Sequence, residues 1–281
     1  MNDSVHFTPA DAASWITVPT GNTSKYRRGV LGVATGSAAY PGAAVMGVDA
    51  AVHTGVGMVR YVGPERAVDS VLARRPEVVS GVGRVQAWLV GSGISASSLD
   101  DLDPTTAEAF RHASDDGVPV VVDAGAIPLV DLGPRSVLTP HAGELATLLG
   151  VPREDVEAAP LDSALQAADR TGSVVLLKGS DTHVVTPGGS VRLVASSATP
   201  WLAAAGAGDV LGGVLGALVA ARAGQGDVGP EDLAHLAATA AVVHGVAARR
   251  ASGGGPFTMT ALAEAVSGVV RDLAVDGDAR D

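Results

Sequence analysis

The residues best suited to carry chemistry form a glycine-rich stretch, Gly206-Ala207-Gly208-Asp209, directly before an apolar helical pattern. At a helix start, free backbone N–H groups point outward and favour an anion. Gly206, Ala207 and Gly208 would therefore form an anion hole for a transferring phosphoryl group. Asp209 would be the catalytic base that takes a proton from the attacking hydroxyl. The alternative is a plain loop in which Asp209 complements the helix dipole.

A second candidate segment begins with Lys178, at the end of the apolar run Val174–Leu177. Ligands of open α/β sheets bind beyond the carboxyl ends of the strands, so Lys178 would meet nucleotide phosphates. The alternative is a lysine that leaves a strand for solvent, but Lys25 is the only other lysine in the chain. The predicted nucleotide-binding residues of this segment are Lys178, Gly179, Ser180, Asp181 and Thr182.

The third candidate is the turn around His141 and Glu144, which again follows a strand-like run. Pro140 and Gly143 fix the turn at the mouth of the predicted sheet. His141 would hydrogen-bond a ligand amide or phosphate, and Glu144 would hold a metal through a bound water. No direct metal ligand is assigned. The alternative is a helix-starting turn with a capping His141 and a solvated Glu144.

Two further glycine-containing segments follow predicted strands, Gly36-Ser37 and Gly91-Ser92-Gly93. Each places small residues where a ligand can approach the backbone closely. Neither matches the GxxxxGK[ST] phosphate loop, and the second lacks the third glycine of the dinucleotide-binding fingerprint. A P-loop enzyme and a Rossmann dehydrogenase are both disfavoured.

The elements around these residues alternate between short Val-rich runs and helical patterns, which predicts an α/β fold with a doubly wound, mostly parallel sheet and helices on both faces. The predicted strands are Val30–Ala34, Met58–Val62, Ala87–Val90, Val118–Val122, Val137–Leu138 and Val174–Leu177, with a hairpin at His183–Val185 and Val191–Val194. The predicted helices are Ala43–His53, Pro64–Arg74, Thr105–Asp115, Ala142–Leu149, Leu161–Arg170, Asp209–Ala223, Glu231–Arg250 and Thr260–Ala274. We expect an irregular lead-in over 1–24, a single domain over 25–276 and a frayed tail over 277–281.

The 281 residues carry a formal net charge of −11, which disfavours nucleic acid as a partner because phosphate backbones are bound chiefly by Lys and Arg. The chain has no cysteine, which excludes disulfides and thiolate metal sites. No apolar run reaches membrane-spanning length, and the start of the chain lacks a signal-peptide pattern. We expect a cytoplasmic protein without a membrane partner.

In this order, the segments resemble the NAD(P)H-hydrate dehydratase family, a branch of the ribokinase-like superfamily. The resemblance runs from about Lys25 to the end of the last helix. Gly36–Arg60 and Thr139–Glu144 are characteristic of the family, whereas Gly206–Asp209 is shared by the whole superfamily. The resemblance implies the ribokinase-like form of the α/β fold.

The resemblance also implies a reaction, the repair of the S-epimer of hydrated NADH or NADPH. The C6 hydroxyl of the damaged nicotinamide ring would be phosphorylated by ADP or ATP, and phosphate would then leave, because it is a better leaving group than water. Mg2+ is expected beside the phosphates. The residues implied to contact the hydrate are Ala43, Gly93, His141 and Asp209, and those implied to contact the nucleotide are Lys178 to Thr182 and Gly208.

As partners, the resemblance implies small molecules, a homo-oligomer with a tetramer as the expected state, and a separate epimerase acting on the same metabolite. The sequence departs from the family at Ala142, where Pro is frequent, at Thr199-Pro200, where Asn is frequent, and at Gly125, where a second Asp is usual. The rival hypotheses are a ribokinase-like kinase of a vitamin precursor and a nucleotide-binding regulator without turnover. The sequence leaves the choice between ADP and ATP open.

Overall fold

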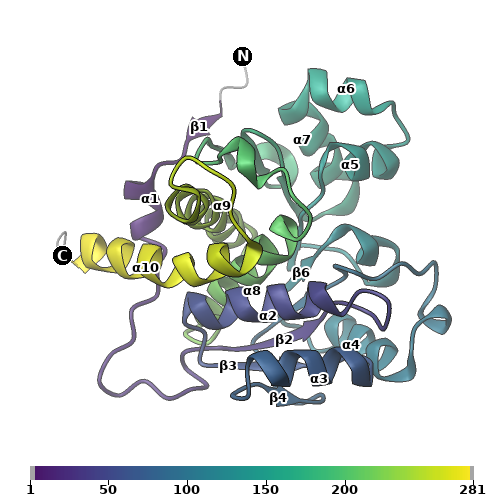
Figure 1. Ribbon diagram of the computed structural model, residues 1–281. Coiled ribbons are helices and arrows are strands. Elements are labelled where there is room, and N and C mark those ends of the chain that lie inside the picture. Colours follow the sequence, from purple (N-terminus) through teal and green to yellow (C-terminus); the bar gives the residue numbers. More distant parts are fainter. Residues whose placement is uncertain (1–3, 279–281) are drawn as a thin grey trace.

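The computed structural model describes residues 4–278 and has one ten-stranded sheet with helices on both faces (Figure 1). The spatial strand order is β1-β10-β9-β8-β7-β6-β5-β2-β3-β4. The strands are β1 (Val5–His6), β2 (Val30–Ala34), β3 (Met58–Tyr61), β4 (Val79–Ser80), β5 (Ala87–Val90), β6 (Val120–Val122), β7 (Ser136–Leu138), β8 (Val174–Leu177), β9 (Thr182–Val185) and β10 (Arg192–Ala195). The helices are α1 (Pro9–Ala13), α2 (Pro41–Thr54), α3 (Glu65–Arg74), α4 (Pro104–Asp115), α5 (Ala142–Leu149), α6 (Arg153–Ala158), α7 (Pro160–Thr171), α8 (Ala207–Ala223), α9 (Pro230–Ser252) and α10 (Met259–Asp278).

The sheet is parallel from β4 to β8, and β9 and β10 add an antiparallel hairpin. The order in which strands are added to the sheet reverses at β2, which pairs in parallel with β3 on one side and with β5 on the other. Such a switch point opens a crevice beyond the carboxyl ends of the two central strands. The predicted doubly wound α/β architecture and the hairpin are confirmed.

Two apolar layers cover the two faces of the sheet, and β2 contributes to both. Leu31 and Val33 belong to the layer that contains α2, α8, α9 and α10, whereas Val30 and Ala34 face the layer with α4, α5 and α7. Side chains on a strand alternate between faces, so a strand covered on both sides must be apolar throughout. This explains the continuous Val-rich runs in the sequence.

The start of the chain differs from the predicted irregular lead-in. Residues 5–6 form β1, which pairs in parallel with β10, and α1 follows with a capping box between Thr8 and Asp11. Ala12 and Ala13 of α1 are buried. These elements have two and five residues, too short for a periodic pattern, and tertiary packing stabilises them.

At the other end, α10 continues to Asp278, beyond the predicted boundary at 276. Residues 279–281 of the predicted tail lie outside the described part of the chain. Two short elements, β4 and α6, were not predicted. Among residues 4–278, no helix is both long and apolar enough to cross a membrane.

Candidate functional site

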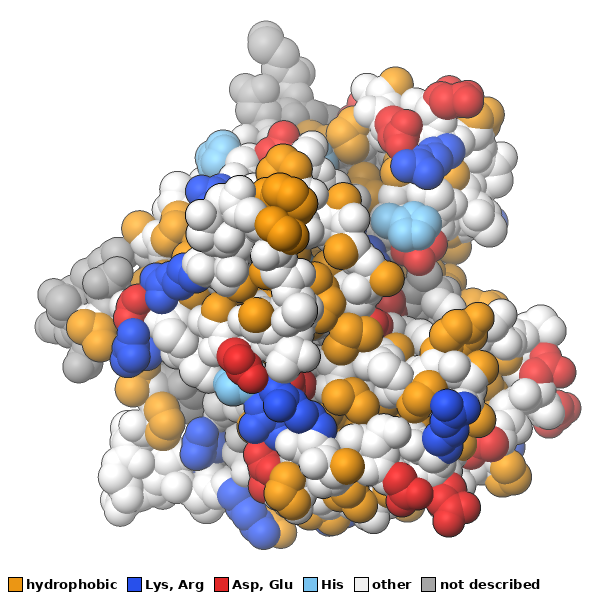
Figure 2. Space-filling model, viewed as in Figure 1, with side chains coloured by type: hydrophobic (Ala, Val, Ile, Leu, Met, Phe, Trp, Pro, Cys, Tyr) orange, Lys and Arg blue, Asp and Glu red, His pale blue; other side chains and the backbone are white. Residues whose placement is uncertain are grey.

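The crevice at the switch point is formed by the loops that follow β2 and β5. The Gly36 amide donates to the Ser92 carbonyl at 2.6 Å, which ties the two loops together. A Cβ atom on Gly93 would lie 2.7 Å from the Cβ of Ala43, so the two predicted substrate contacts are neighbours. Gly36 and Gly93 both have positive φ, the region in which glycine is favoured. Figure 2 shows a hollow between the part of the molecule over α5, α6 and α7 and the part over α2 and α3.

The glycine-rich stretch begins α8 as predicted. Gly206 is the N-cap residue with a φ of +93°, and within the described chain no side chain caps this helix start. A Cβ on Gly206 would lie 2.4 Å from the sulfur of Met46, so only glycine fits here without movement. The amides of Gly208 and Asp209 have no acceptor among residues 4–278 and lie at the positive end of the helix dipole. This is a backbone site suited to an anion.

Asp209 is half-buried in a small pocket and accepts a hydrogen bond from the Ser92 hydroxyl. Burial raises the pKa of the Asp209 carboxyl above its ordinary value, and the nearby charge of Asp123 also raises it. The Ser92 bond and the Lys178 charge lower that pKa and so oppose the shift. The balance makes Asp209 a stronger base than an exposed aspartate. The pocket is lined by Thr35, Ala43, Gly47, Leu89, Ser92, Asp123, Gly208, Asp209 and Gly212.

Lys178 places a positive charge beside the start of α8. Its Nζ lies 3.1 Å from Asp123 Oδ1 and 3.8 Å from Glu144 Oε2. A Cβ on Gly208 would lie 3.5 Å from the same Nζ, so the amine borders the free amides. Asp123 also accepts a 2.8 Å hydrogen bond from the Thr139 hydroxyl, which fixes the carboxylate that holds the lysine.

His141 caps α5, as in the alternative weighed for this turn. The Glu144 amide donates to His141 Nδ1 at 3.1 Å, and the His141 amide donates to Glu144 Oε2 at 2.7 Å. The second ring nitrogen, Nε2, lies 3.1 Å from Glu144 Oε1. The backbone of His141 forms a parallel bridge with that of Lys178, so the exposed imidazole lies at the rim of the site. Contact between His141 and the substrate stays a prediction.

The remaining predicted nucleotide-binding residues form the turn between β8 and β9. Gly179, Ser180 and Asp181 are exposed, and Thr182 is buried in β9 opposite Ala195. Within residues 4–278, this turn makes no side-chain hydrogen bond to the anion site. It borders the site through its connection to Lys178.

Four residues of the site had no predicted role. Ser92 lies between two glycines, and nothing in this short pattern predicts that its hydroxyl donates a hydrogen bond to Asp209, the predicted base. Asp123 follows a buried strand at the carboxyl edge, a signal that could have identified it. The buried Thr35 hydroxyl has no partner among the described residues, and it lines the same pocket. His244 of α9 is buried, its Nε2 has no hydrogen-bond partner among the described residues, and burial lowers the pKa of its ring to about 4.

The structure gives a physical reason for one departure from the family pattern. A Cβ on Gly125 would lie 2.3 Å from the carbonyl oxygen of Ile94. An aspartate at position 125 would therefore collide with the loop that follows β5. The close approach of that loop requires glycine here.

Comparison with known proteins identifies the group to which this architecture belongs. The family model for NAD(P)H-hydrate dehydratase matches residues 31–267. The bifunctional NAD(P)H-hydrate repair enzyme Nnr of Mycobacterium tuberculosis is 41% identical over 238 residues, which are 80% of this chain and 48% of that protein. The chain thus spans about half the length of this relative. The ADP-dependent (S)-NAD(P)H-hydrate dehydratase of Xanthomonas campestris is 32% identical over 227 residues, which are 72% of this chain and 76% of that protein.

The fold also matches a solved structure. The ADP/ATP-dependent NAD(P)H-hydrate dehydratase of Bacillus subtilis, co-crystallised with ATP and Mg2+, superimposes with a TM-score of 0.81 at 21% sequence identity. The match covers 97% of this chain and 100% of that one. The predicted ribokinase-like form of the α/β fold is confirmed. From the family model and these relatives together, the chain belongs to the NAD(P)H-hydrate dehydratase family.

Proposed function

We propose that this protein catalyses the nucleotide-dependent dehydration of the S-epimer of hydrated NADH or NADPH. The observation that carries the proposal is the pairing of free amides at Gly208 and Asp209 with a half-buried carboxylate on the same helix turn. Phosphoryl transfer requires that the reacting groups are positioned and that the charge on the moving phosphoryl group is stabilised. The amides would stabilise that charge, and the carboxylate would position the attacking hydroxyl. The name of the 32% identical relative supports the substrate class.

In the proposed reaction, the C6 hydroxyl of the hydrate attacks the terminal phosphoryl group of the nucleotide. Asp209 removes the hydroxyl proton. Its pKa is raised, which makes the carboxylate a stronger base and therefore better suited to general-base catalysis near neutral pH. The amides of Gly208 and Asp209 stabilise the charge on the moving phosphoryl group. Loss of phosphate from C6 and of a proton from C5 then restores the double bond.

The hydrate would lie over Ala43 and Gly93, where the two crossing loops expose backbone instead of bulky side chains. The unpartnered hydroxyl of Thr35 is available to a polar group of the ring. Lys178, which Asp123 holds in place through a hydrogen bond, would attract the nucleotide phosphates. We further propose that the turn Gly179–Thr182 and the rim residue His141 contact the two ligands.

Mg2+ would neutralise phosphate charge when it is bound with the nucleotide. Among residues 4–278, no cluster of three or more His, Asp or Glu side chains could hold a metal alone. Mg2+ in phosphate chemistry is usually held by one or two carboxylates together with phosphates and water. Glu144, and Asp123 beside it, fit that smaller role, so we propose that the ion arrives with the nucleotide.

The rival activity is phosphorylation of a vitamin precursor, in which the product keeps its phosphate. The same anion site and Asp209 would serve that reaction. The family match over residues 31–267 favours dehydration. We also propose that the protein is cytoplasmic, because reduced coenzymes and adenine nucleotides are cytoplasmic metabolites. We further propose that it forms a homo-oligomer, a tetramer, and that a separate epimerase acts on the same metabolite.

The test is to follow the absorbance of regenerated NADH at 340 nm after mixing S-hydrate, Mg2+ and either ADP or ATP. We expect recovery with at least one nucleotide and release of one phosphate per NADH formed. Phosphate transfer to hydroxyethylthiazole without NADH recovery would favour the rival kinase. No recovery with either nucleotide would remove the proposal.

A further inference from the structure

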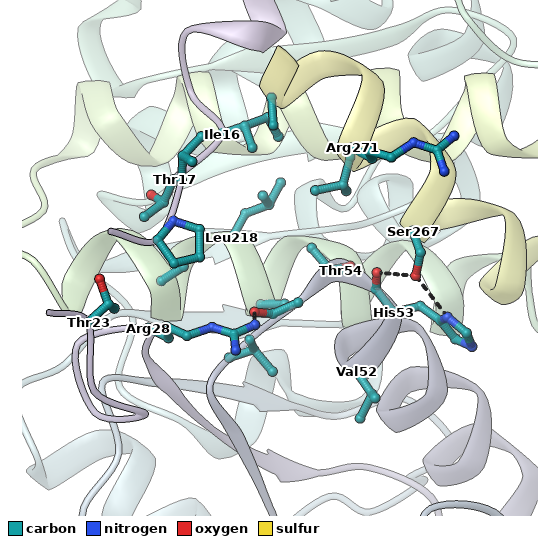
Figure 3. Close-up of a pocket in the computed structure, with 18 of the residues that line it drawn as sticks. Ile16, Thr17, Thr23, Arg28, Val52, His53, Thr54, Leu218, Ser267 and Arg271 are labelled. Atoms are coloured by element: carbon teal, nitrogen blue, oxygen red, sulfur yellow. Dashed lines mark hydrogen bonds between the residues drawn. The ribbon is translucent and has the colours of Figure 1, made fainter. Parts of the chain in front are cut away.

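A second cavity lies far along α2 and α8 from the site described above. It has a volume of about 350 Å³, is partly open to solvent, and is bordered by the lead-in segment 16–23, the carboxyl end of α2, the second half of α8 and the second half of α10. Figure 3 shows Ile16 and Thr17 on one side, Leu218 behind and Arg28 reaching in from below. Cavities of this size commonly hold small molecules.

The charge of the cavity lining is unlike that of the whole protein. The chain has 30 acidic residues and a net charge of −11. Among the residues whose side chains the structure describes, the cavity lining contains Arg28, Arg271 and His53 but no aspartate or glutamate. Much of the remaining wall is apolar, including Val52, Val56, Ala217, Leu218, Ala221, Val270 and Ala274. A cavity of this kind suits a ligand with a negative group and an apolar body.

Arg28 is the cationic group best placed to bind such a ligand. Its Nη2 donates to the Gly55 carbonyl at 2.6 Å, which fixes the guanidinium at the cavity wall. Its Nε is buried without a hydrogen-bond partner, and no carboxylate in the described chain pairs with this side chain. A fixed guanidinium with N–H groups to spare is suited to a carboxylate.

The two other cationic or ionisable side chains of the lining, His53 and Arg271, and the hydroxyls of Thr54 and Ser267 are engaged with the protein. His53 Nδ1 lies 3.0 Å from Ser267 Oγ, and that hydroxyl donates to the His53 carbonyl at 2.8 Å. Thr54 donates to the Ala50 carbonyl, and Arg271 Nε is 3.2 Å from Asp272. This leaves Arg28 as the lining cation with no acidic partner in the described residues.

We propose that this cavity is a binding site for a small amphipathic anion, a monocarboxylate with a short aliphatic chain. The carboxylate would pair with Arg28, and the chain would lie against Val56, Leu218 and Val270. The cavity is separate from the proposed reaction site, because it lies at the carboxyl ends of α2 and α8 and the proposed reaction site lies at their amino ends. The proposal does not depend on the proposed dehydratase activity.

The test uses octanoate as the probe and isothermal titration calorimetry on the full chain without nucleotide. We expect one saturable site per chain. Arg28→Met should weaken octanoate binding about tenfold or more, since a charge-assisted hydrogen bond is lost, whereas Arg28→Lys should retain most of the affinity. Octan-1-ol, which lacks the charge, should bind at least about tenfold more weakly than octanoate.

Two matched pairs locate the binding. Ala221→Leu fills the cavity and should abolish octanoate binding, whereas Ala223→Leu, two residues further on α8, should not. Arg170→Met removes an arginine that also donates to a backbone carbonyl, at Leu149, but lies outside the lining, and should leave binding unchanged. The proposal is overturned if octanoate does not saturate, or if Ala221→Leu and Arg28→Met bind it as the unsubstituted protein does. Circular dichroism checks that each variant is folded.

Discussion

The two ends of the helix pair α2 and α8 line pockets of different chemical character. At their amino ends, Ala43, Gly208 and Asp209 line the pocket that we propose as the reaction site. At their carboxyl ends, Thr54 of α2 and Leu218 of α8 line the apolar cavity with Arg28. The proposed reaction site and the second, largely apolar cavity thus lie at opposite ends of the same pair of helices.

The difference lies in which backbone groups are left without partners. At the amino end of α8, the amides of Gly208 and Asp209 have no acceptor in the described part of the chain. At the carboxyl end of α2, Gly55 adopts a φ of +96° and donates to Val52, Arg28 bonds the Gly55 carbonyl and Ser267 bonds the His53 carbonyl. Unsatisfied polar groups cost stability, so proteins retain them mainly where a ligand completes them. At the amino end of α8 the groups left for a ligand are therefore backbone amides, whereas at the carboxyl end of α2 the backbone is satisfied and the group left for a ligand is the Arg28 side chain.

The largest expected effect is at the open end. Asp209→Asn should reduce the rate of NADH recovery about 10²- to 10⁴-fold, the usual contribution of a general base, while ADP binding measured by calorimetry is retained. Asp227→Asn, at an exposed surface carboxylate, serves as the control. Near-normal turnover in Asp209→Asn would remove the assigned base.

The same variant should gain stability at neutral pH. Because the pKa of Asp209 is raised in the folded protein, the folded state holds its proton to higher pH than the unfolded state does. Stability therefore falls as pH rises from the ordinary aspartate pKa through the raised one, and the charged form remains costly at pH 7. Asparagine removes that cost. A lower midpoint of thermal unfolding for Asp209→Asn at pH 7 would contradict this.

The next effect concerns the contact that joins the two helices. A Cβ on Gly213 of α8 would lie 2.1 Å from the Gly47 carbonyl of α2, so Gly213→Ala must push the helices apart. We expect a loss of about 1–3 kcal/mol in the free energy of unfolding, measured by urea denaturation. Gly226→Ala, where a Cβ meets no atom within 4 Å, should change stability little. Equal losses in both variants would argue against close helix contact as the cause.

A smaller effect is expected at the closed end. Arg28→Met removes the hydrogen bond to the Gly55 carbonyl, and we expect a loss of about 1 kcal/mol in the free energy of unfolding, since the side chain is partly exposed. The rate of NADH recovery should hardly change. A large loss of turnover with unchanged stability would mean that the two helix ends are coupled.

The smallest effect is a shift in pH dependence. The Ser92 hydroxyl lowers the pKa of Asp209, so Ser92→Ala should raise it further. Asp209 must be ionised to act as a base, and the acid limb of the kcat/KM profile should therefore move to higher pH. Ser70→Ala, which removes a hydroxyl bonded to the Arg66 carbonyl on α3, should leave the profile unchanged. A shift to lower pH in Ser92→Ala would mean that the sign of the Ser92 contribution is wrong.

Much of this fold is readable from local patterns. The Val-rich runs predicted β2, β5 and β8 because strands covered on both faces are apolar throughout. The stretch Gly206–Asp209 predicted a helix start with free amides, since only nearby residues decide that geometry. The two-residue β1 and the five-residue α1 were missed, because so few residues carry no period.

The central strands of the sheet and the helix that begins at the glycine-rich stretch could be predicted from the amino-acid sequence, since each depends on residues close together in the chain. The pairs of residues that build the site and the cavity could not. Ser92 and Asp209 are 117 residues apart, and Lys178 and Asp123 are 55 apart. Arg28 meets Gly55 27 residues away, and their cavity closes only when α2, α8 and α10 pack together. Such pairs depend on how whole elements pack, which no local period records.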